Sequence, residues 1–180
     1  MFKIMENQIL IAGFGGQGIL FAGKFIAYEG LIEGMQLSWL PSYGPEMRGG
    51  TANCSIILSD GQIGSPLVTK PDILVALNLP SLDKYEDDVK PGGLIYINSS
   101  IIGRKVKRTD LEAYYIPATQ SAEDHGLSGL ANMIMIGSIH KHSGLFPLEI
   151  VKKALEKVVS PKKPEMYTHN MKAIELGYSY

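Results

Sequence analysis

The sequence has only one cysteine, Cys54, among its 180 residues. A single cysteine cannot form an internal disulfide, and by itself it cannot hold an iron–sulfur cluster or a structural zinc ion. Cys54 lies in the mostly apolar stretch 52–58, and no residue that could act as a base stands near it in the sequence. We therefore expect this thiol to be a small buried residue of the core rather than a nucleophile.

The chain also lacks a surplus of charge of either sign, and it lacks long apolar runs. Its formal net charge is -1, so no overall field attracts nucleic acid or a membrane surface. Residues 1–8 carry Lys3 and Glu6 and do not form the apolar core of a signal peptide, and the stretch 9–12 is too short to cross a bilayer. We expect one cytoplasmic domain over residues 1–180 that contacts neither nucleic acid nor membrane.

Apolar runs that alternate with helical patterns predict an α/β protein. Short runs bounded by turn-forming residues indicate strands at 8–12, 35–40, 51–58, 73–78, 94–98 and 112–116. Helical patterns cover 19–30, 131–140, 148–159 and 165–176. Ser81 is expected to cap a short helix ending at Tyr85, and Ile63 to begin a partner strand after a turn at 59–62. This order favours a Rossmann-like, doubly wound, mostly parallel sheet with helices on both faces.

The first expected strand runs directly into a glycine-rich turn. Gly13, Gly15 and Gly18 give the spacing G-x-G-x-x-G between an expected strand and an expected helix. Gly13 can adopt a positive φ at the bend, Gly15 leaves room for a phosphate, and Gly18 allows close packing of the helix on the strand. The helix start then offers free N–H groups and a positive dipole end to an anion.

Three neighbouring residues extend this interpretation. Gly16 is a further permissive position, Gln17 supplies a polar side chain, and Lys24 supplies a positive charge if its side chain folds back. A turn needed only for packing is the alternative, but the flanking strand and helix favour a phosphate site. The acidic residue that binds the ribose of NAD is expected about twenty residues after the turn, where no Asp or Glu stands between 36 and 40. This absence argues against a dehydrogenase.

A second glycine cluster lies at residues 41–50. Ser42 adds a hydroxyl group, and Arg48 with Gly49 can present a planar guanidinium to a phosphate or a carboxylate. Because loops that follow parallel strands meet at one edge of a sheet, this segment is expected beside the first glycine turn. The alternative is a structured surface loop with an ion pair between Glu46 and Arg48, and the segment alone favours neither.

Together these segments carry a family resemblance. Residues 13–18 and 41–50 closely resemble the gamma subunit of 2-oxoacid:ferredoxin oxidoreductases. The similarity continues through 71–76, 90–93, 116–118 and Asn132, and it ends near Asn170 and Gly177, so it covers nearly the whole chain.

The resemblance implies a function in a larger enzyme that oxidatively decarboxylates a 2-oxoacid to an acyl-CoA and passes electrons to ferredoxin. Thiamine diphosphate and Mg²⁺ would lie with alpha and beta subunits, and iron–sulfur clusters on beta or on a ferredoxin-like delta subunit. Coenzyme A would lie at or near this chain. The residues implied to bind it are Gly13, Gly15, Gly16, Gln17, Gly18, Lys24, Ser42, Arg48, Gly49 and Asn132.

The resemblance leaves alternatives for the substrate and the role. The 2-oxoglutarate type is favoured, while the pyruvate, branched-chain and indolepyruvate types remain open because the 2-oxoacid pocket would belong to other chains. A stand-alone nucleotide-binding or regulatory module is the alternative from another functional class. The chain shows no nucleophile–base pair and no carboxylate dyad, so we expect it to carry no complete catalytic set.

The remaining polar clusters are interpreted as structural. The histidines lack the spacing of a metal site, so surface or capping roles are expected for His125, His140, His142 and His169. The basic run 104–108 is expected to be a solvated edge or a subunit contact rather than a nucleic-acid site. Residues 86–88 are expected to be a helix end that faces water.

Overall fold

The computed structural model describes residues 5–42 and 51–180. Its strands are β1 (Glu6–Phe14), β2 (Gln36–Ser42), β3 (Thr51–Ser59), β4 (Ile73–Ala76), β5 (Leu94–Asn98) and β6 (Glu112–Ile116). Its α-helices are α1 (Ile19–Ile32), α2 (Leu79–Tyr85), α3 (Ala118–Asp124), α4 (Ala131–Ser143), α5 (Leu148–Val158) and α6 (Pro164–Gly177). A 3₁₀-helix, η2, covers Glu86–Asp88.

The six described strands form one sheet in the order β2-β3-β1-β4-β5-β6. Strands β1, β4, β5 and β6 are parallel neighbours, whereas β3 is antiparallel to both β1 and β2. Only β3 therefore runs against the common direction of the described strands. The predicted doubly wound, mostly parallel α/β fold is confirmed, and the sheet is mixed because of β3.

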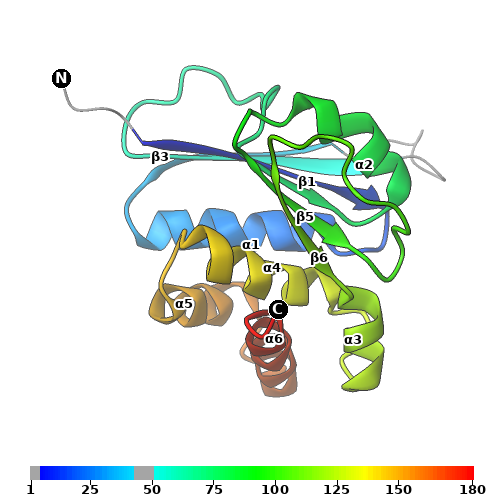
Figure 1. Cartoon of the computed structure of the whole chain (residues 1–180). Coiled ribbons are helices and arrows are strands. Elements are labelled where there is room, and N and C mark those ends of the chain that lie inside the picture. Colours follow the sequence, from blue (N-terminus) through cyan, green and yellow to red (C-terminus); the bar gives the residue numbers. More distant parts are fainter. Residues whose placement is uncertain (1–4, 43–50) are drawn as a thin grey trace.

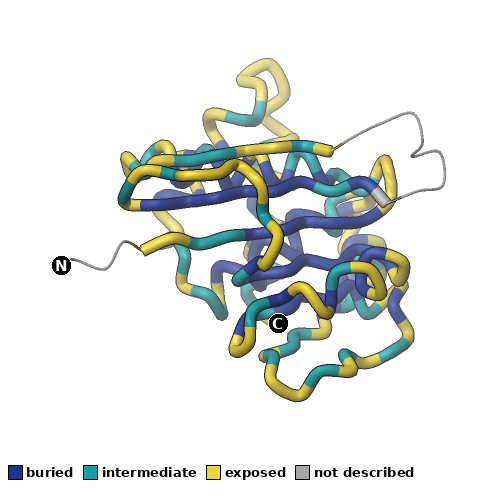
Figure 2. The backbone as a smooth tube through the Cα atoms, turned by 90° about the horizontal axis from the view of Figure 1, so that it is seen from above, coloured by how far each residue is buried: buried dark blue, intermediate teal, exposed yellow. Residues whose placement is uncertain are grey.

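Helices cover both faces of this sheet. Figure 1 shows α1, α4, α5 and α6 below the sheet and α2 above it. The core is divided in the same way. Ile9 and Ile11 of β1 belong to the hydrophobic cluster that includes residues of α1 and α4, whereas Leu10 belongs to the cluster on the other face, which includes Leu82 of α2. Successive side chains of a strand point to opposite faces, so a strand buried on both faces is apolar throughout. Figure 2 shows this as continuous burial along the central strands.

Helix α1 packs closely on β3. A Cβ atom on Gly23 would lie 2.4 Å from the sulfur of Cys54, so glycine is needed for the helix to approach the sheet. Cys54 is fully buried, as expected, and this burial raises the pKa of its thiol to about 12. The thiol therefore stays protonated at neutral pH and serves as a packing residue.

Helix α4 crosses α6 at two glycines. A Cβ on Gly137 would lie 2.0 Å from the carbonyl oxygen of Ile174, and a Cβ on Gly177 would lie 2.0 Å from that of Ile134. The two backbones thus touch without side chains between them. This crossing fixes α4, whose first turn carries Asn132.

Two local expectations in the middle of the chain are wrong. Ile63 does not begin a strand, because both edges of β3 are already paired, with β1 on one side and β2 on the other. Ser81 does not cap α2. The N–H of Ser81 instead donates to Oδ1 of Asn78 at 2.8 Å, so the helix begins at Leu79.

Helix α3 was not expected from the sequence. It is short, and the Oγ atom of Ser100 accepts a hydrogen bond from the N–H of Gln120 in its first turn. Because Ser100 lies in a distant loop, no capping pattern in the neighbouring sequence predicts this helix.

The expected surface role is wrong for His140. Its Nε2 atom lies 2.9 Å from Oε1 of Glu29, and both side chains are fully buried between α4 and α1. Burial raises the pKa of the Glu29 carboxyl, and the nearby His140 opposes this shift. His142 is partly buried instead, and its ring stacks on Tyr114 with 3.8 Å between centroids.

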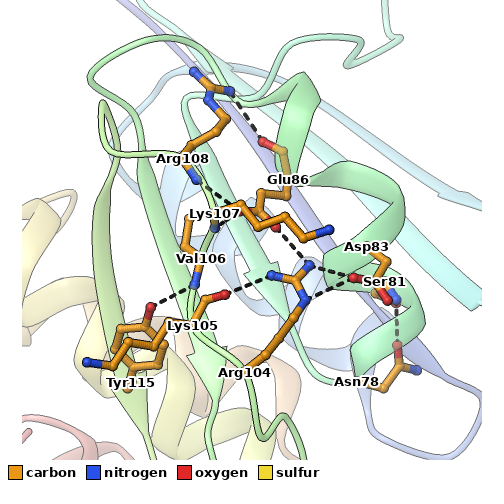
Figure 3. Close-up of polar contacts among 10 residues, drawn as sticks. All are labelled: Asn78, Ser81, Asp83, Glu86, Arg104, Lys105, Val106, Lys107, Arg108 and Tyr115. Carbon is orange, nitrogen blue, oxygen red and sulfur yellow. Dashed lines mark hydrogen bonds and ion pairs between the residues drawn. The ribbon is translucent and has the colours of Figure 1, made fainter.

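The basic run 104–108 lies against α2 and η2 and still exposes Lys105 and Lys107, so the expected solvated edge is present only in part. Arg104 forms ion pairs with Asp83 and Glu86, as Figure 3 shows. Glu86 also accepts hydrogen bonds from the N–H groups of Lys107 and Arg108. Glu86 is 2% exposed, so the expectation that it faces water is wrong. It is a buried acceptor that holds this loop against η2.

Candidate functional site

The glycine turn follows β1 at the carboxyl edge of the parallel strands. Gly16 and Gly18 have φ values of 92° and 73°, a region that side chains of L-residues disfavour. Gly13 instead lies inside β1, paired with Ala52 of β3, and does not have a positive φ. The predicted turn is present, but its bend lies at Gly16 and Gly18 because β1 extends to Phe14.

Gln17 ties this turn to the neighbouring strand. Its Oε1 atom accepts a hydrogen bond from the N–H of Phe14 at 2.6 Å, and its Nε2 atom donates to the carbonyl of Leu77 at 3.1 Å. A Cβ on Gly13 would lie 2.5 Å from that Oε1 atom, so glycine at this position makes room for the contact. Both polar atoms of Gln17 are therefore engaged within the chain.

Asn132 holds the other end of the turn. Its Nδ2 atom donates to the carbonyl oxygen of Gly18 at 3.1 Å, across 114 positions of the sequence. A Cβ on Gly18 would lie 2.4 Å from this Nδ2 atom, so Gly18 accommodates helix α4 rather than the strand. The Oδ1 atom of Asn132 is buried and has no hydrogen-bond partner among the described residues.

Part of the turn has backbone N–H groups without an acceptor among the described residues. No described residue accepts a hydrogen bond from the N–H of Gly15, Gly16 or Gly18. The first intrahelical bond of α1 runs from Ala22 to Gly18, which leaves the N–H groups of residues 19–21 without a helical acceptor. These groups and the positive end of the α1 dipole form an environment that attracts an anion.

Two pockets meet at Gly16. The amide pocket, defined by residues 14–16, 18–21 and Ala52, has a volume of about 270 Å³. The acceptor pocket has a volume of about 210 Å³. Its lining comes from the glycine turn, from the ends of β4 and β5, and from α3 and the start of α4: Gly16, Gln17, Leu77, Asn98, Ile101, Thr119, Ala122, Glu123, Ser128, Gly129, Ala131 and Asn132. The turn is thus the wall between two neighbouring pockets at the carboxyl edge of the sheet.

The other predicted site residues fall into two groups. Ser42 ends β2 opposite Asn53, which in turn lies opposite Ala12 of β1, so Ser42 shares the edge of the glycine turn. Lys24 is exposed, and its Nζ atom lies 5.7 Å from the centroid of the Tyr28 ring, farther along α1. Arg48 and Gly49 lie outside the described residues.

Sequence reasoning missed the contribution of β5 and α3. Asn98 ends β5 in the acceptor pocket, where its Nδ2 atom donates to Oγ1 of Thr119 at 2.8 Å. Asn78 follows β4 at the same edge and caps α2. Both asparagines stand directly after apolar runs, and that recurrence is a signal that could have pointed to this edge.

A cluster of metal-ligating side chains and a membrane-spanning helix are both absent from the described residues. Within residues 5–42 and 51–180, no three His, Cys, Asp or Glu side chains converge as metal ligands would. None of the described helices is both long and apolar enough to span a bilayer. The chemistry that this arrangement supports is anion binding by backbone amides, next to a pocket with polar side chains.

Sequence comparison relates the chain to oxidoreductase subunits. A family model described as pyruvate ferredoxin/flavodoxin oxidoreductase matches residues 8–180. Subunit KorC of 2-oxoglutarate synthase from Methanocaldococcus jannaschii is 36% identical over 177 residues, covering 97% of this chain and 93% of KorC. Ketoisovalerate oxidoreductase subunit VorA from Methanothermobacter thermautotrophicus is 46% identical over 135 residues, or 73% of this chain. The match spans 27% to 28% of the length of the VorA relatives.

Two solved structures share the fold. The gamma subunit of a keto/oxoacid ferredoxin oxidoreductase from Geobacter sulfurreducens PCA superposes with a TM-score of 0.81 and 28% identity, over 96% of both chains. The 2-oxoglutarate:ferredoxin oxidoreductase from Magnetococcus marinus, with 2-oxoglutarate, coenzyme A and succinyl-CoA bound, superposes with a TM-score of 0.83 and 24% identity. That match covers 97% of this chain and 30% of the other.

Proposed function

Because this chain belongs to the pyruvate ferredoxin/flavodoxin oxidoreductase family, we propose that it is the gamma-type subunit of a 2-oxoacid:ferredoxin oxidoreductase and that its glycine turn binds coenzyme A. The observation that carries the proposal is the set of N–H groups at Gly15, Gly16 and Gly18, which line the amide pocket and have no acceptor among the described residues. Coenzyme A contains a diphosphate, and helix starts with free amides bind such groups. The related enzyme from Magnetococcus marinus was solved with coenzyme A bound.

The residues of this chain would bind and orient the ligand rather than transform it. Coenzyme A, when bound, supplies the thiol that accepts the acyl group. The amides of the turn would hold its diphosphate, and Gln17 and Asn132 would keep those amides in place through their bonds to Leu77 and Gly18.

The redox and decarboxylation chemistry would belong to partner subunits. Because its only cysteine is buried and protonated, this chain offers no set of thiolates for an iron–sulfur cluster. We therefore assign thiamine diphosphate, Mg²⁺ and the clusters to alpha, beta and delta-type partners in the cytoplasm, with ferredoxin as electron acceptor. The 180 residues would form a single gamma-type domain of this assembly.

We propose 2-oxoglutarate as the substrate of the assembled enzyme. KorC, from a 2-oxoglutarate synthase, matches this chain over nearly its whole length, whereas the match to VorA covers a short part of that longer protein. Activity measurements with 2-oxoglutarate, pyruvate, 2-oxoisovalerate and indolepyruvate would test this choice. Preference for any of the last three would refute the substrate and leave the subunit role intact.

The coenzyme A site is tested by filling the amide pocket. In the enzyme purified with its partner subunits, Gly15→Val should raise the KM for coenzyme A by about tenfold or more, because the new side chain occupies the place of the phosphates. The KM for the 2-oxoacid and the thiamine diphosphate content should not change. Gly64→Val is the matched control, since a Cβ there meets no other atom within 4 Å.

Two results would contradict the proposal. If the KM for coenzyme A is unchanged in Gly15→Val, coenzyme A does not bind in the amide pocket. Recovery of the chain alone from its native source, binding adenine nucleotides without larger partners, would favour a stand-alone regulatory module.

A further inference from the structure

Strand β2 is an edge strand whose outer side pairs with no described strand. It stands at one end of the sheet order, and β3 is its partner on the inner side. Its residues, Gln36–Ser42, include no charged side chain. Natural sheets protect such edges with charges, with proline or with a covering segment, because unpaired N–H and C=O groups attract another strand. In β2 the one device of this kind is Pro41, near the end of the strand.

Pro41 also shows which backbone groups of β2 point outward. It has no N–H and lies opposite Cys54, so these two residues form a non-hydrogen-bonded pair. Hydrogen-bonded and non-hydrogen-bonded pairs alternate along antiparallel strands. Leu37 and Trp39 therefore also turn their N–H and C=O groups away from β3, toward the side where no described strand lies.

The opposite edge of the sheet, at β6, is protected. This strand carries the charged Glu112. A loop also contacts it, because the N–H of Val106 donates to the hydroxyl of Tyr115 at 2.9 Å. A charge and a covering loop both discourage the addition of another strand. Of the two described edges, β2 is thus the one open to pairing.

Helix α1 extends this uncovered surface on one face of the sheet. Trp39 lies beside the helix, since a Cβ on Gly23 would be 3.2 Å from its Nε1 atom. Leu31 of α1 is 58% exposed, and Lys24 is the only exposed charged residue of the helix. The Lys24 ammonium lies over the ring of Tyr28 on the same helix. A helix that is apolar on nearly all sides is usually covered on all sides, so α1 and β2 together have the character of an interface.

A second copy of β2 matches this edge. If two copies run antiparallel about a two-fold axis at Ser38, Leu37 of each copy lies opposite Trp39 of the other. Each such pair exchanges two N–H···O bonds, so every outward N–H and C=O of these two residues is paired. A register centred on Trp39 would instead place the Leu37 carbonyl opposite Pro41, which has no N–H to donate.

The side chains support the same register. Leu37 and Trp39 both point to the face of the sheet that α1 covers, so across the axis they pack against each other. Because β2 carries no charge, the pairing brings no like charges together.

We propose that two copies of this chain associate through β2, antiparallel about an axis at Ser38, so that their two six-stranded sheets become one continuous sheet. The inference goes beyond the proposed function and does not rest on the coenzyme A site. It implies that gamma-type chains occur in pairs in the assembled enzyme.

A charge at Ser38 tests the register. In the dimer Ser38 lies opposite Ser38 of the second copy in a non-hydrogen-bonded pair, where side chains come closest. Ser38→Lys and Ser38→Asp each place like charges there, and each should raise the dimer dissociation constant of the full chain by about tenfold or more in sedimentation equilibrium. Thr69→Lys is the matched control, because it adds the same charge at an exposed loop residue and should leave the constant unchanged.

Mixing the two Ser38 variants separates a broken interface from a damaged fold. An equimolar mixture of Ser38→Lys and Ser38→Asp chains should form heterodimers, because a lysine then lies opposite an aspartate. Chains that had failed to fold would not recover on mixing. Trp39 gives a second readout, since it is the only tryptophan and is 37% exposed. Its fluorescence emission should move to shorter wavelength in the wild-type dimer and in the mixture, but not in either variant alone.

Three results would overturn the proposal. They are a wild-type chain that sediments as a monomer at about 100 μM, Ser38 variants that dimerise as well as the wild type, and a mixture that does not recover dimers. A monomeric wild-type chain whose assembly with alpha and beta subunits is blocked by Ser38→Lys would assign this edge to a strand of a partner subunit instead. The coenzyme A kinetics of Gly15→Val test the proposed function separately.

Discussion

Replacement of Gly18 by alanine should cost more stability than the same replacement at Gly16. Both residues have positive φ, so each substitution brings backbone strain of about 1–3 kcal/mol. A Cβ on Gly16 enters open space, whereas a Cβ on Gly18 would lie 2.4 Å from Nδ2 of Asn132. The new methyl group must displace Asn132 and break its bond to the Gly18 carbonyl. We expect the overpacking and the lost bond together to add about 2–4 kcal/mol.

Urea unfolding of the full chain measures this difference. The two single variants would be compared with the same substitutions made in an Asn132→Ala background, where the space next to Gly18 is open. In that background Gly18→Ala should cost no more free energy of unfolding than Gly16→Ala. Equal costs in the native background, or an extra cost of Gly18→Ala that survives removal of Asn132, would refute the reasoning.

Other predictions concern the framework that carries the site. Burial raises the pKa of the Glu29 carboxyl above its ordinary 4.5, so this carboxyl keeps its proton in the folded chain at pH values where it loses the proton in the unfolded chain. The stability of the fold should therefore fall as pH rises above 4.5. Glu29→Gln should remove this dependence of the melting temperature on pH. Burial also acts to raise the pKa of Glu86, but bonds from Lys107 and Arg104 outweigh it and lower the pKa. Its contribution is therefore lost as pH falls below 4.5, and Glu86→Gln should flatten the acid limb of the same profile. Gly137→Ala places a methyl group 2.0 Å from a backbone oxygen of α6 and should destabilise the chain by about 3 kcal/mol or more in urea, or prevent folding.

Much of the fold could be predicted because its signals are local. Strands β5 and β6 have the expected bounds, and α1 begins at the expected Ile19. The spacing of apolar residues and the turn-forming glycines predict these elements because both depend on only a few neighbouring residues. The insertion of β3 between β2 and β1 was not predictable in this way. An alternating pattern identifies a strand but does not name its neighbours, and the expected partner of β3 at Ile63 was wrong for that reason.

The candidate site was predictable in position but not in construction. The spacing of glycines located the turn at residues 13–18, because a tight bend between strand and helix needs them. The contacts that hold the turn join residues far apart, with 60 positions between Gln17 and Leu77. A pattern within a short stretch of sequence cannot predict a hydrogen bond between residues so far apart. Asn132 entered the sequence analysis only through the family resemblance, and its bond to Gly18 became visible in the structure.

These contacts explain how the turn is held while the N–H groups of Gly15, Gly16 and Gly18 have no acceptor among the described residues. The side chain of Gln17 accepts a hydrogen bond from the Phe14 N–H and donates one to the Leu77 carbonyl, and that of Asn132 donates to the Gly18 carbonyl. These bonds hold the turn without using the N–H groups that line the amide pocket. The ordering of the turn therefore takes place on folding, before any ligand arrives. Loss of either contact should loosen the turn and weaken coenzyme A binding even where the altered residue does not touch the phosphates. A variant such as Gln17→Leu should then raise the KM for coenzyme A and lower stability together, whereas Gly15→Val should raise the KM alone.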